Sequence, residues 1–535
     1  MKYKPVIGLE IHAELKTRTK MFCDSLNDPN EKHPNVNICP VCMGHPGTLP
    51  VINQEAVKKV IMAGLALNCK IAEGTFFERK NYFYPDLPKG YQISQYQKPL
   101  CQNGVLEIPN PKSQIPDNDQ NSNTKKIRVT RIHLEEDAGR LYHLPDKDYS
   151  LVDYNRAGVP LMELVTEPDF ETGWEVRKFT EELQLMWQYL NISEANMEKG
   201  EMRVEVNISL RDEQQETSNK FGIKVEIKNL NSIKFAADAV DYEISRQKEI
   251  LEAGEKVKQE TRGWNENKKQ TFSQRSKEEA HDYRYFPEPD LPPLYVVSTK
   301  SQISNHKSQI QNRSEPFIIE DIRAEMVELP QQRRERFKKR YNLPDRDIEI
   351  LTVNKQLGDY YEHVASELDA AARDYHKKMG RVGEEPVEKH VTEKLHSLAA
   401  NYMITEFPML MSAWAGEINE LEGFRIEPEA LAELMVLVFH KELSSTGAKA
   451  VLKEMAETGL HPEQIMKEKD LGQVSDTREL QKAVEKIISD NPKAAEDFKA
   501  GREASLKFLI GMAMRETKGK ANPQVVEQML KNMIR

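Results

Sequence analysis

The sequence predicts an α+β protein in which an N-terminal domain built on an antiparallel sheet precedes helical middle and tail domains. Two observations favour this class. Alternating apolar and polar residues, turn formers and aromatics fill residues 1–297, whereas from about Ile319 onward apolar residues recur mostly at helical spacing. Between them, residues 282–294 carry prolines that disfavour regular structure. We therefore predict domains at residues 1–297, 298–423 and 424–535.

Three stretches predict strands with one apolar and one polar face. In residues 6–12, the two-residue period of a strand places Glu10 and His12 on one face. Residues 203–210 and 224–228 repeat this pattern, and their polar positions are Arg203, Glu205, Asn207 and Ser209, then Lys224, Glu226 and Lys228. Each stretch alone is also what a half-exposed antiparallel strand looks like. Taken together, they predict a sheet whose polar face forms the floor of a site.

An acidic stretch at residues 131–169 contributes to the same site. It carries nine Asp or Glu against four Lys or Arg, several of them beside residues that are normally buried. A buried carboxylate costs several kcal/mol unless a partner takes up its charge, so either arginines or a cation must satisfy these groups. Within this stretch, we expect Asp146 and Asp148 to lie in a solvated loop.

These residue types point to metal-assisted phosphoryl transfer. Carboxylates with one imidazole suit a hard cation such as Mg²⁺, which completes its shell with water and phosphate oxygens. The neighbouring cations suit a phosphate; they are Arg203, Lys224 and Lys228. The sequence has no G-x-x-x-x-G-K-[ST] loop and no G-x-G-x-x-G turn opening a helix, so a P-loop or Rossmann nucleotide site is not expected.

Three of the five cysteines lie close together in the sequence. Cys39 and Cys42 form a C-x2-C pair, and Cys23 precedes them. Structural zinc takes four Cys or His ligands, so His33 or His45 would have to complete the shell. Reduced cysteines are the alternative, because no thioredoxin-like βαβ pattern supports a redox pair.

Composition limits the class of protein further. The chain has 535 residues, 39% of them hydrophobic and 30% charged, and no run approaches eighteen apolar residues. We expect no membrane span or secretory signal, and a cytoplasmic location. The net charge of −10 does not indicate a nucleic-acid binder, but residues 493–535 carry nine Lys or Arg against five Asp or Glu. A local basic patch in the tail is therefore expected.

A series of long motifs carries a resemblance to a known family. In order, they are VIGLEIHAELKTRTKMFC, CPVCMGHPGTLPVIN, RKNYFYPDLPKGYQISQY, IHLEEDAGR, DYNRAGVPLMELVTEPD, RVEVNISLR, KVEIKNLNSIK, QETRGW, DYRYFPEPDLPPL, SSTGAKAVLKEM and GREASLKFLIGMAMRETKGKANPQVV. Together they resemble the B subunit of the tRNA-dependent amidotransferase, the GatB family. The likeness covers the N-terminal domain almost continuously and extends over a YqeY-like tail domain.

The resemblance implies a fold and a reaction. The N-terminal domain would be a cradle that resembles glutamine synthetase, and it would use ATP and Mg²⁺ to convert Glu on tRNA(Gln), Asp on tRNA(Asn), or both, to an acyl phosphate. Ammonia from the amidase subunit GatA would travel through a tunnel and form the amide, with GatC joining the two subunits. The helical and tail domains would hold the tRNA.

The resemblance also implies site residues. Carried over to this sequence, the metal and phosphoryl-transfer residues are Glu10, His12, Glu136, Glu163, Glu205 and Glu226, with Lys80 a tunnel or phosphate residue.

Two departures and one alternative accompany this resemblance. Ser25 stands where family members with the zinc motif often carry a second cysteine, which leaves zinc open. Residues 369–396 look like an insertion with no physical explanation. The alternative function is a non-catalytic tRNA-binding scaffold, although an acidic floor would repel tRNA phosphates unless a cation intervened.

Overall fold

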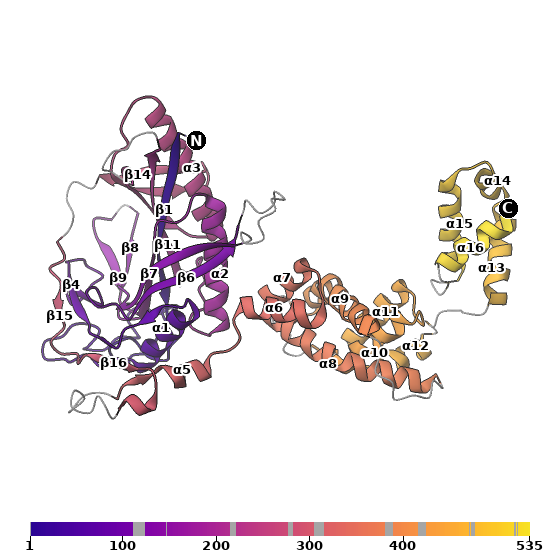
Figure 1. Ribbon diagram of the computed structural model, residues 1–535, viewed down its shortest axis with the longest axis horizontal. Coiled ribbons are helices and arrows are strands. Elements are labelled where there is room, and N and C mark those ends of the chain that lie inside the picture. The colour runs from indigo at the N-terminus through magenta and orange to yellow at the C-terminus, as the bar shows by residue number, and fades with distance from the viewer. Residues whose placement is uncertain are drawn as a thin grey trace. The chain divides into compact units, whose positions relative to one another are not determined.

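The computed structural model describes residues 2–110, 124–145, 147–213, 221–276, 282–303, 315–379, 389–415, 424–469, 471, 477–517, 521 and 523–534. Asp146 and residues 380–388 of the expected insertion therefore lie outside the described residues. Contacts divide the chain into two compact units, Met1–Pro330 and Gln331–Arg535, and each is described by itself. As the sequence predicts, a large sheet dominates the N-terminal part and helices form the C-terminal part (Figure 1). Within the described ranges, no helix is both long and apolar enough to cross a bilayer.

The first unit is built on one large sheet. Its described strands follow the order β14-β13-β12-β11-β1-β10-β7-β6-β2. Their bounds are β1 Tyr3–Glu14, β2 Lys70–Ile71, β6 Cys101–Pro109, β7 Thr124–Glu136, β10 Pro160–Thr166, β11 Met202–Asp212, β12 Val225–Leu230, β13 Glu260–Asn265 and β14 Gln270–Ser276. All described neighbours pair antiparallel except β12 and β13, which are parallel because helix α3 returns the chain to the same end of the sheet. The predicted antiparallel sheet therefore includes one parallel pair.

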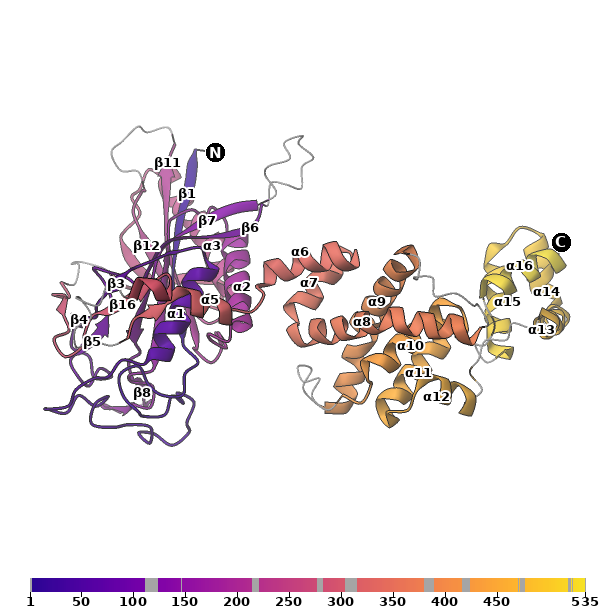
Figure 2. The same cartoon turned by 60° about the horizontal axis from the view of Figure 1, so that its bottom comes forward.

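Three helices cover one face of the sheet: α1 (Gln54–Ala66), α2 (Gly173–Tyr189) and α3 (Ile233–Glu252) (Figures 1 and 2). Each begins at a polar N-cap whose side chain accepts a hydrogen bond from the first turn, at Asn53, Thr172 and Ser232 respectively. The apolar positions of the strands, including Ile7, Leu9 and Ile11, pack beneath these helices and are at most 1% exposed. The alternating pattern predicted from sequence is confirmed here, and it leaves the polar positions on the opposite, open face.

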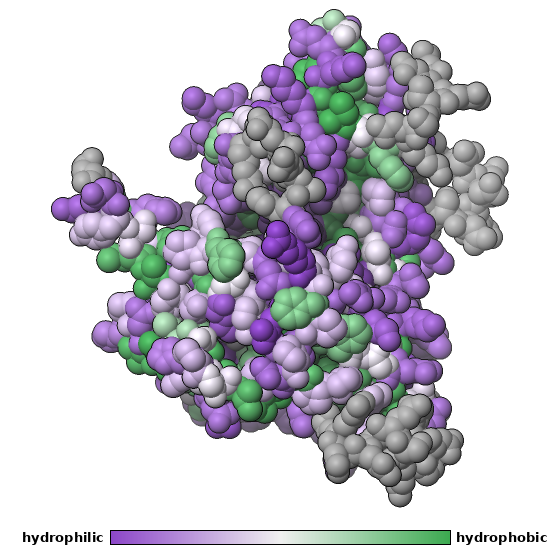
Figure 3. Space-filling model, turned by 90° about the vertical axis from the view of Figure 1, so that its left-hand side faces the viewer, coloured by the Kyte–Doolittle hydropathy of each residue, from purple (hydrophilic) through white to green (hydrophobic). Residues whose placement is uncertain are grey.

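Smaller sheets lie elsewhere in this unit. They are formed by β15-β4-β5, β17-β16-β3 and β8-β9. Their bounds are β3 Gly74–Thr75, β4 Glu78–Asn81, β5 Tyr91–Ser94, β8 Arg140–His143, β9 Ser150–Asp153, β15 Phe286–Pro287, β16 Leu294–Val297 and β17 Phe317–Ile318. Short helices follow, η2 (Lys300–Gln302) and α5 (Ile319–Glu325). Figure 3 looks onto the side of the molecule that carries β4, β8 and β15, where hydrophilic residues predominate across the middle.

The second unit is helical. Its described helices are α6 Pro330–Tyr341, α7 Asp345–Val353, α8 Lys355–Lys378, α9 Lys389–Ala415, α10 Pro428–Phe439, α11 Ser445–Thr458, α12 Pro462–Glu468, α13 Thr477–Asp490, α14 Pro492–Lys499, α15 Glu503–Glu516 and α16 Pro523–Ile534. One apolar core joins α6 to α12, and a separate core joins α13 to α16. The apolar helix α10 is buried between α8 and α9, which ties residues after 424 to the earlier helices. The domain boundaries at 297 and 423 remain predictions.

Candidate functional site

Carboxylates and imidazoles from three adjacent strands meet on the open face of the large sheet. Register places His12 of β1 opposite Glu163 of β10, and Glu163 opposite His133 of β7. Glu10 and Glu135 lie two positions along their strands from His12 and His133, so they share the same face. Glu163, His133 and Glu135 are at most 6% exposed. A buried site is thus assembled from segments far apart in the sequence.

The side chains converge closely. The His12 Nε2 atom lies 3.4 Å from both Glu135 Oε1 and Glu163 Oε2, and 4.0 Å from Glu10 Oε1. The His133 Nε2 atom lies 3.8 Å from Glu135 Oε2 and 3.7 Å from Glu163 Oε2. Two overlapping groups, Glu10-His12-Glu163 and His133-Glu135-Glu163, each have their ligand atoms within 4.8 Å of one another. This is the spacing of groups that could share one cation.

The electrostatics of the group favour a cation. Burial disfavours charge on His12, but hydrogen bonds and charge from Glu135 and Glu163 outweigh it and raise the pKa of His12 to about 10. Burial and the Glu163 carboxylate raise the pKa of Glu10. In Glu163, burial opposes ionisation, but His133 and His12 outweigh it and lower the pKa to about 2. Three carboxylates crowd this group, and oxygen-rich donor sets with one imidazole fit Mg²⁺.

Lys80 reaches the same region from strand β4. Its Nζ lies 5.1 Å from the centre of the Tyr283 ring and 5.9 Å from that of Tyr82. Burial disfavours its charge, but the carboxylates of Glu135 and Glu163 outweigh this and raise the pKa of Lys80 above its ordinary value. Lys80 therefore remains a cation beside the acidic group, where it can attract a phosphate.

A second polar group adjoins the first on strands β11 and β12. Lys228 Nζ donates to Glu205 Oε2 at 2.6 Å and lies 3.6 Å from Glu226 Oε1. Glu205 of β11 pairs with Glu10 of β1, so the Lys228 group lies next to the acidic cluster. Thr261 Oγ1 donates to Glu226 Oε2 at 3.0 Å. Glu205 and Glu226 are thus partly neutralised by Lys228 and stand beside the cluster rather than in it.

The two other predicted cations lie at different places on the open face. Arg203, opposite His12 in the register, binds Asp137, with Nη2 to Oδ2 at 2.6 Å. Lys224 is exposed just before β12, two residues before Glu226. Arg203 therefore borders the acidic cluster, whereas Lys224 lies near a separate cavity.

Glu136 is not brought into the cluster. It follows Glu135 on β7, so it points to the other side of the strand, opposite Pro160. There its carboxylate binds Lys89 and accepts a hydrogen bond from Ile93 N at 2.9 Å. The residue that the sequence reasoning passed over is Glu135, together with His133. The alternation of Arg131, His133 and Glu135 with buried Ile132 and Leu134 is the signal that identifies them.

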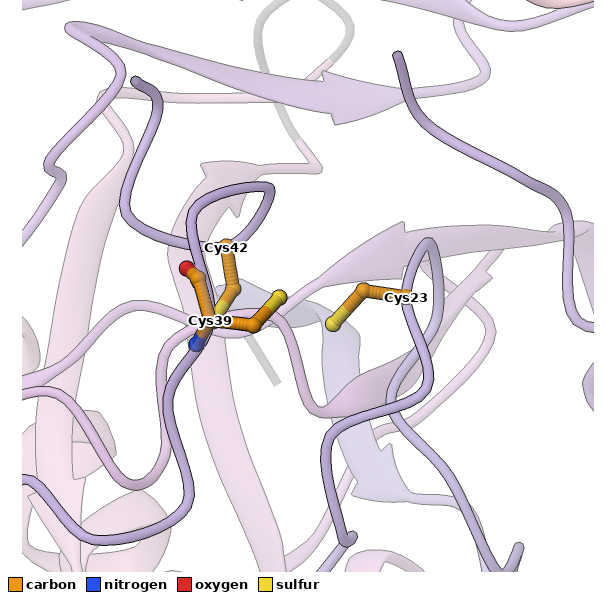
Figure 4. Close-up of side chains that lie close together, drawn as sticks. All are labelled: Cys23, Cys39 and Cys42. Carbon is orange, nitrogen blue, oxygen red and sulfur yellow. The ribbon is translucent and has the colours of Figure 1, made fainter. Parts of the chain in front are cut away.

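The three cysteines approach one another from two loops (Figure 4). The ligand atoms of Cys23, Cys39 and Cys42 lie within 4.8 Å of one another. Ser25 Oγ and the buried Lys20 Nζ each lie 3.9 Å from Cys42 Sγ. His33 instead binds Glu31 through Nδ1 at 2.8 Å, and neither it nor His45 joins the described group. Three of the four ligands of a structural zinc site are present, and zinc remains a prediction.

Two parts of the chain match domains of known protein families. Residues 5–302 match the GatB/GatE catalytic domain, and residues 385–534 match the GatB domain. The first match alone covers more than half of the chain. The chain belongs to the GatB family. Both groups of the site described above, the acidic cluster and the Lys228 group, lie within the first match.

Full-length relatives agree with this family. The chain is 44% identical over 536 residues to the B subunit of the aspartyl/glutamyl-tRNA(Asn/Gln) amidotransferase of Carboxydothermus hydrogenoformans, covering 100% of the chain and 99% of that protein. The protein of the same name from Caldicellulosiruptor bescii is 43% identical over 531 residues, covering 99% of each. That of Dehalococcoides mccartyi is 42% identical over 536 residues, covering 100% of the chain and 99% of the relative. The chain is therefore similar to these B subunits over its whole length.

Proposed function

We propose that this chain is the subunit of a tRNA-dependent amidotransferase that activates the amino acid of a mischarged tRNA. In this reaction, ATP phosphorylates the side-chain carboxylate of Glu on tRNA(Gln), of Asp on tRNA(Asn), or of both. Ammonia from the amidase subunit GatA then displaces phosphate, and GatC joins the two subunits. The membership of the GatB family supports this role, and the buried group around His12 carries it. The large sheet with its open face would be the glutamine-synthetase-like cradle.

The side chains of the cluster have distinct roles in this proposal. Mg²⁺ would displace the proton from His12, because only a neutral imidazole binds a metal. Glu10, His12, Glu135 and Glu163 would then hold Mg²⁺, which neutralises charge on the transferred phosphoryl group when bound. Lys80 and Lys228 would orient the phosphates, one from each side of the cluster. Glu135 and Glu163 are at most 6% exposed. A reaction enclosed at this depth would be shielded from water, which would otherwise hydrolyse the acyl phosphate. Glu205 and Glu226 hold Lys228 in place.

The scaffold alternative is not favoured. A subunit that only bound tRNA would have no use for three carboxylates around His12, since they repel RNA phosphates. The family model that matches residues 5–302 also describes a catalytic domain. The tRNA-holding role is assigned instead to the helical tail, where residues 493–535 carry nine Lys or Arg against five Asp or Glu.

The proposal predicts that amide formation depends on ATP and on a divalent cation. The complex with GatA and GatC would be given each mischarged tRNA, with an ammonium salt in place of glutamine so that the amidase is not required. We expect ADP, phosphate and amidated aminoacyl-tRNA in the complete reaction, and loss of all three when EDTA removes the metal. Correctly charged Gln-tRNA(Gln) serves as the control. Amidation that proceeds without ATP would rule out the proposal.

Deleting residues 477–535 should weaken tRNA binding without affecting the acidic cluster. The segment forms its own core, so its removal leaves the core of α6 to α12 intact. With fewer tRNA phosphates neutralised, the salt dependence should also become shallower, by about 0.9 in log–log slope for each phosphate that the tail no longer binds. Affinity measured at several salt concentrations checks this.

A matched variant separates charge from folding in that experiment. Replacing Lys493, Lys499 and Lys507, all exposed, by glutamine in the intact chain should reproduce part of the loss. An unchanged affinity and slope in both proteins would show that the tail does not contact the tRNA backbone.

A further inference from the structure

Three thiols and a buried ammonium gather outside the acidic cluster, where two loops meet (Figure 4). The sulfur atoms of Cys23, Cys39 and Cys42, here called the cysteine group, lie within 4.8 Å of one another. Lys20 Nζ lies 3.9 Å from Cys42 Sγ and donates to Tyr154 O at 3.2 Å. The proposed phosphoryl transfer uses none of these side chains.

The described residues of the cysteine group do not complete a zinc site. Structural zinc is held by four Cys or His ligands. Beside Cys42 Sγ lie instead Ser25 Oγ and the Lys20 ammonium, each at 3.9 Å. A hydroxyl is not among the usual ligands of structural zinc, and an ammonium repels a metal cation. The donor set therefore fits free thiols better than it fits zinc.

Cys42 is the thiol of this group that is best placed to react with an oxidant. Lys20 is 0% exposed, and the Cys39 N–H donates to Cys42 Sγ at 3.1 Å. Both contacts stabilise negative charge on the Cys42 sulfur, and an anionic sulfur is the nucleophile in thiol chemistry. Cys23 and Cys39 are partly exposed, so a small oxidant can approach the group.

Cys23 is the thiol best placed to form a disulfide with Cys42. The Cys23 thiol hydrogen-bonds Cys42 from a different loop. Cys39, in contrast, contacts Cys42 Sγ through its backbone, where its N–H donates and its C=O accepts. Because Cys23 and Cys42 both lie in loops and not in strands, small movements can bring their sulfur atoms to bonding distance.

The loop that carries Cys42 packs on an ion pair at the end of β7. A Cβ at Gly158 would lie 3.5 Å from Cys42 Cβ and 3.9 Å from Glu136 Oε2, and one at Gly44 would lie 2.7 Å from Lys89 Cγ. This contact leaves no room for the loop to move independently of the Lys89 and Glu136 side chains. Strand β7 also supplies two side chains of the acidic cluster, so a shift of the loop reaches the cluster.

We propose that the cysteine group is a peroxide-sensitive thiol switch, in which oxidation joins Cys23 to Cys42 and slows the reaction at the acidic cluster. First, the Cys42 sulfur attacks hydrogen peroxide: an S–O bond forms, the O–O bond breaks, and hydroxide leaves and takes up the Cys42 proton. The Cys23 sulfur then attacks this sulfenic acid: an S–S bond forms, the S–O bond breaks, and hydroxide leaves with the Cys23 proton as water. Two thiols are oxidised and one peroxide is reduced. Only the effect on the rate rests on the proposed function.

Peptide mapping tests the disulfide. The complex with GatA and GatC would be treated with hydrogen peroxide, and remaining thiols would be blocked before digestion and mass spectrometry. We expect a cross-link between Cys23 and Cys42 that dithiothreitol removes. Cys69 and Cys101, 9% and 0% exposed in the apolar core, are internal controls that should stay reduced. A bond between Cys39 and Cys42 instead, or no cross-link at all, would overturn the inference.

The rate of amide formation from an ammonium salt tests the switch without the amidase reaction. We expect peroxide to lower the rate about 10-fold or more, because small displacements of reacting groups are costly, and dithiothreitol to restore it. Cys23→Ser should keep its rate after the same treatment. An equal loss in Cys23→Ser, or an unchanged rate in the cross-linked protein, would overturn the switch. ATP-dependent amidation by the reduced complex would leave the proposed function standing in either case.

Ser25→Cys separates a thiol switch from a zinc site. A fourth sulfur beside Cys42 would complete the ligand set, so we expect this variant to hold stoichiometric zinc and to resist peroxide. The unchanged protein, purified in the same way, should hold far less zinc by elemental analysis. Stoichiometric zinc in the unchanged protein, with thiols that resist peroxide, would overturn the inference.

Discussion

Replacing Glu135 by glutamine is expected to lower the rate of tRNA-dependent ATP cleavage by about 100-fold or more. The carboxylate is 2% exposed, lies 3.4 Å from His12 Nε2 and supplies the largest favourable charge on Lys80. Glutamine keeps the size of the side chain but removes the charge, so it removes one cation ligand and weakens the electrostatic hold on Lys80. The rate constant at saturating ATP and mischarged tRNA, measured in the complex with GatA and GatC, checks this prediction.

Glu136→Gln is the matched control for that experiment, because it makes the same change one residue later. Its carboxylate faces Lys89 on the other side of β7, so we expect the rate to be unchanged at temperatures where the protein is folded. The opposite result, with Glu136→Gln inactive and Glu135→Gln active, would return the catalytic role to Glu136 and refute the assignment made from geometry.

The sequence predicts those parts of the fold that follow from the repeating spacing of apolar and polar residues within one segment. Alternation placed Glu10 with His12 and Arg203 with Glu205 on the polar face, and the structure confirms both pairs on one face of the sheet. The two-residue period is a property of the extended backbone itself, so no knowledge of neighbours is needed. From about Ile319, apolar residues recur at helical spacing, which is also a pattern within single segments. The structure has helices from α5 (Ile319–Glu325) onward, as this pattern predicts.

The choice between Glu135 and Glu136 depends on recognising that residues 131–136 form a strand. Two adjacent acids in a strand point to opposite faces, and composition alone does not say which faces the site. The buried neighbours Ile132 and Leu134 settle it, since they fix the core face of β7 and leave Glu135 on the open face. Treating residues 131–136 as a strand, and not as part of an acidic loop, would have been sufficient.

Strand order and core boundaries depend on packing between distant segments. Helix α3 makes β12 and β13 parallel, which no pattern within either strand reveals. In the helical unit, the apolar surface of α10 is buried against α8 and α9, and this joins residues on both sides of 424.

Glu136→Gln is expected to lower the free energy of unfolding of the first unit by about 3–5 kcal/mol. The Glu136 and Lys89 side chains are 4% and 10% exposed, so this variant leaves a buried ammonium without its partner. The Ile93 N–H also loses a charged acceptor at 2.9 Å. Urea titration of the full chain, followed by tryptophan fluorescence from Trp187 in the core of this unit, measures the change.

A double variant, Glu136→Leu with Lys89→Met, separates the unpaired charge from the lost hydrogen bond. Replacing both members of a buried ion pair by apolar residues is often neutral or stabilising. We therefore expect the double variant to recover most of the stability lost in Glu136→Gln, with a remaining cost of about 1–3 kcal/mol for the unsatisfied Ile93 N–H. A double variant no more stable than Glu136→Gln would contradict this account, because the cost would then not arise from the charge of Lys89. Such a result would point to packing around Gly158, whose Cβ position lies 3.9 Å from Glu136 Oε2.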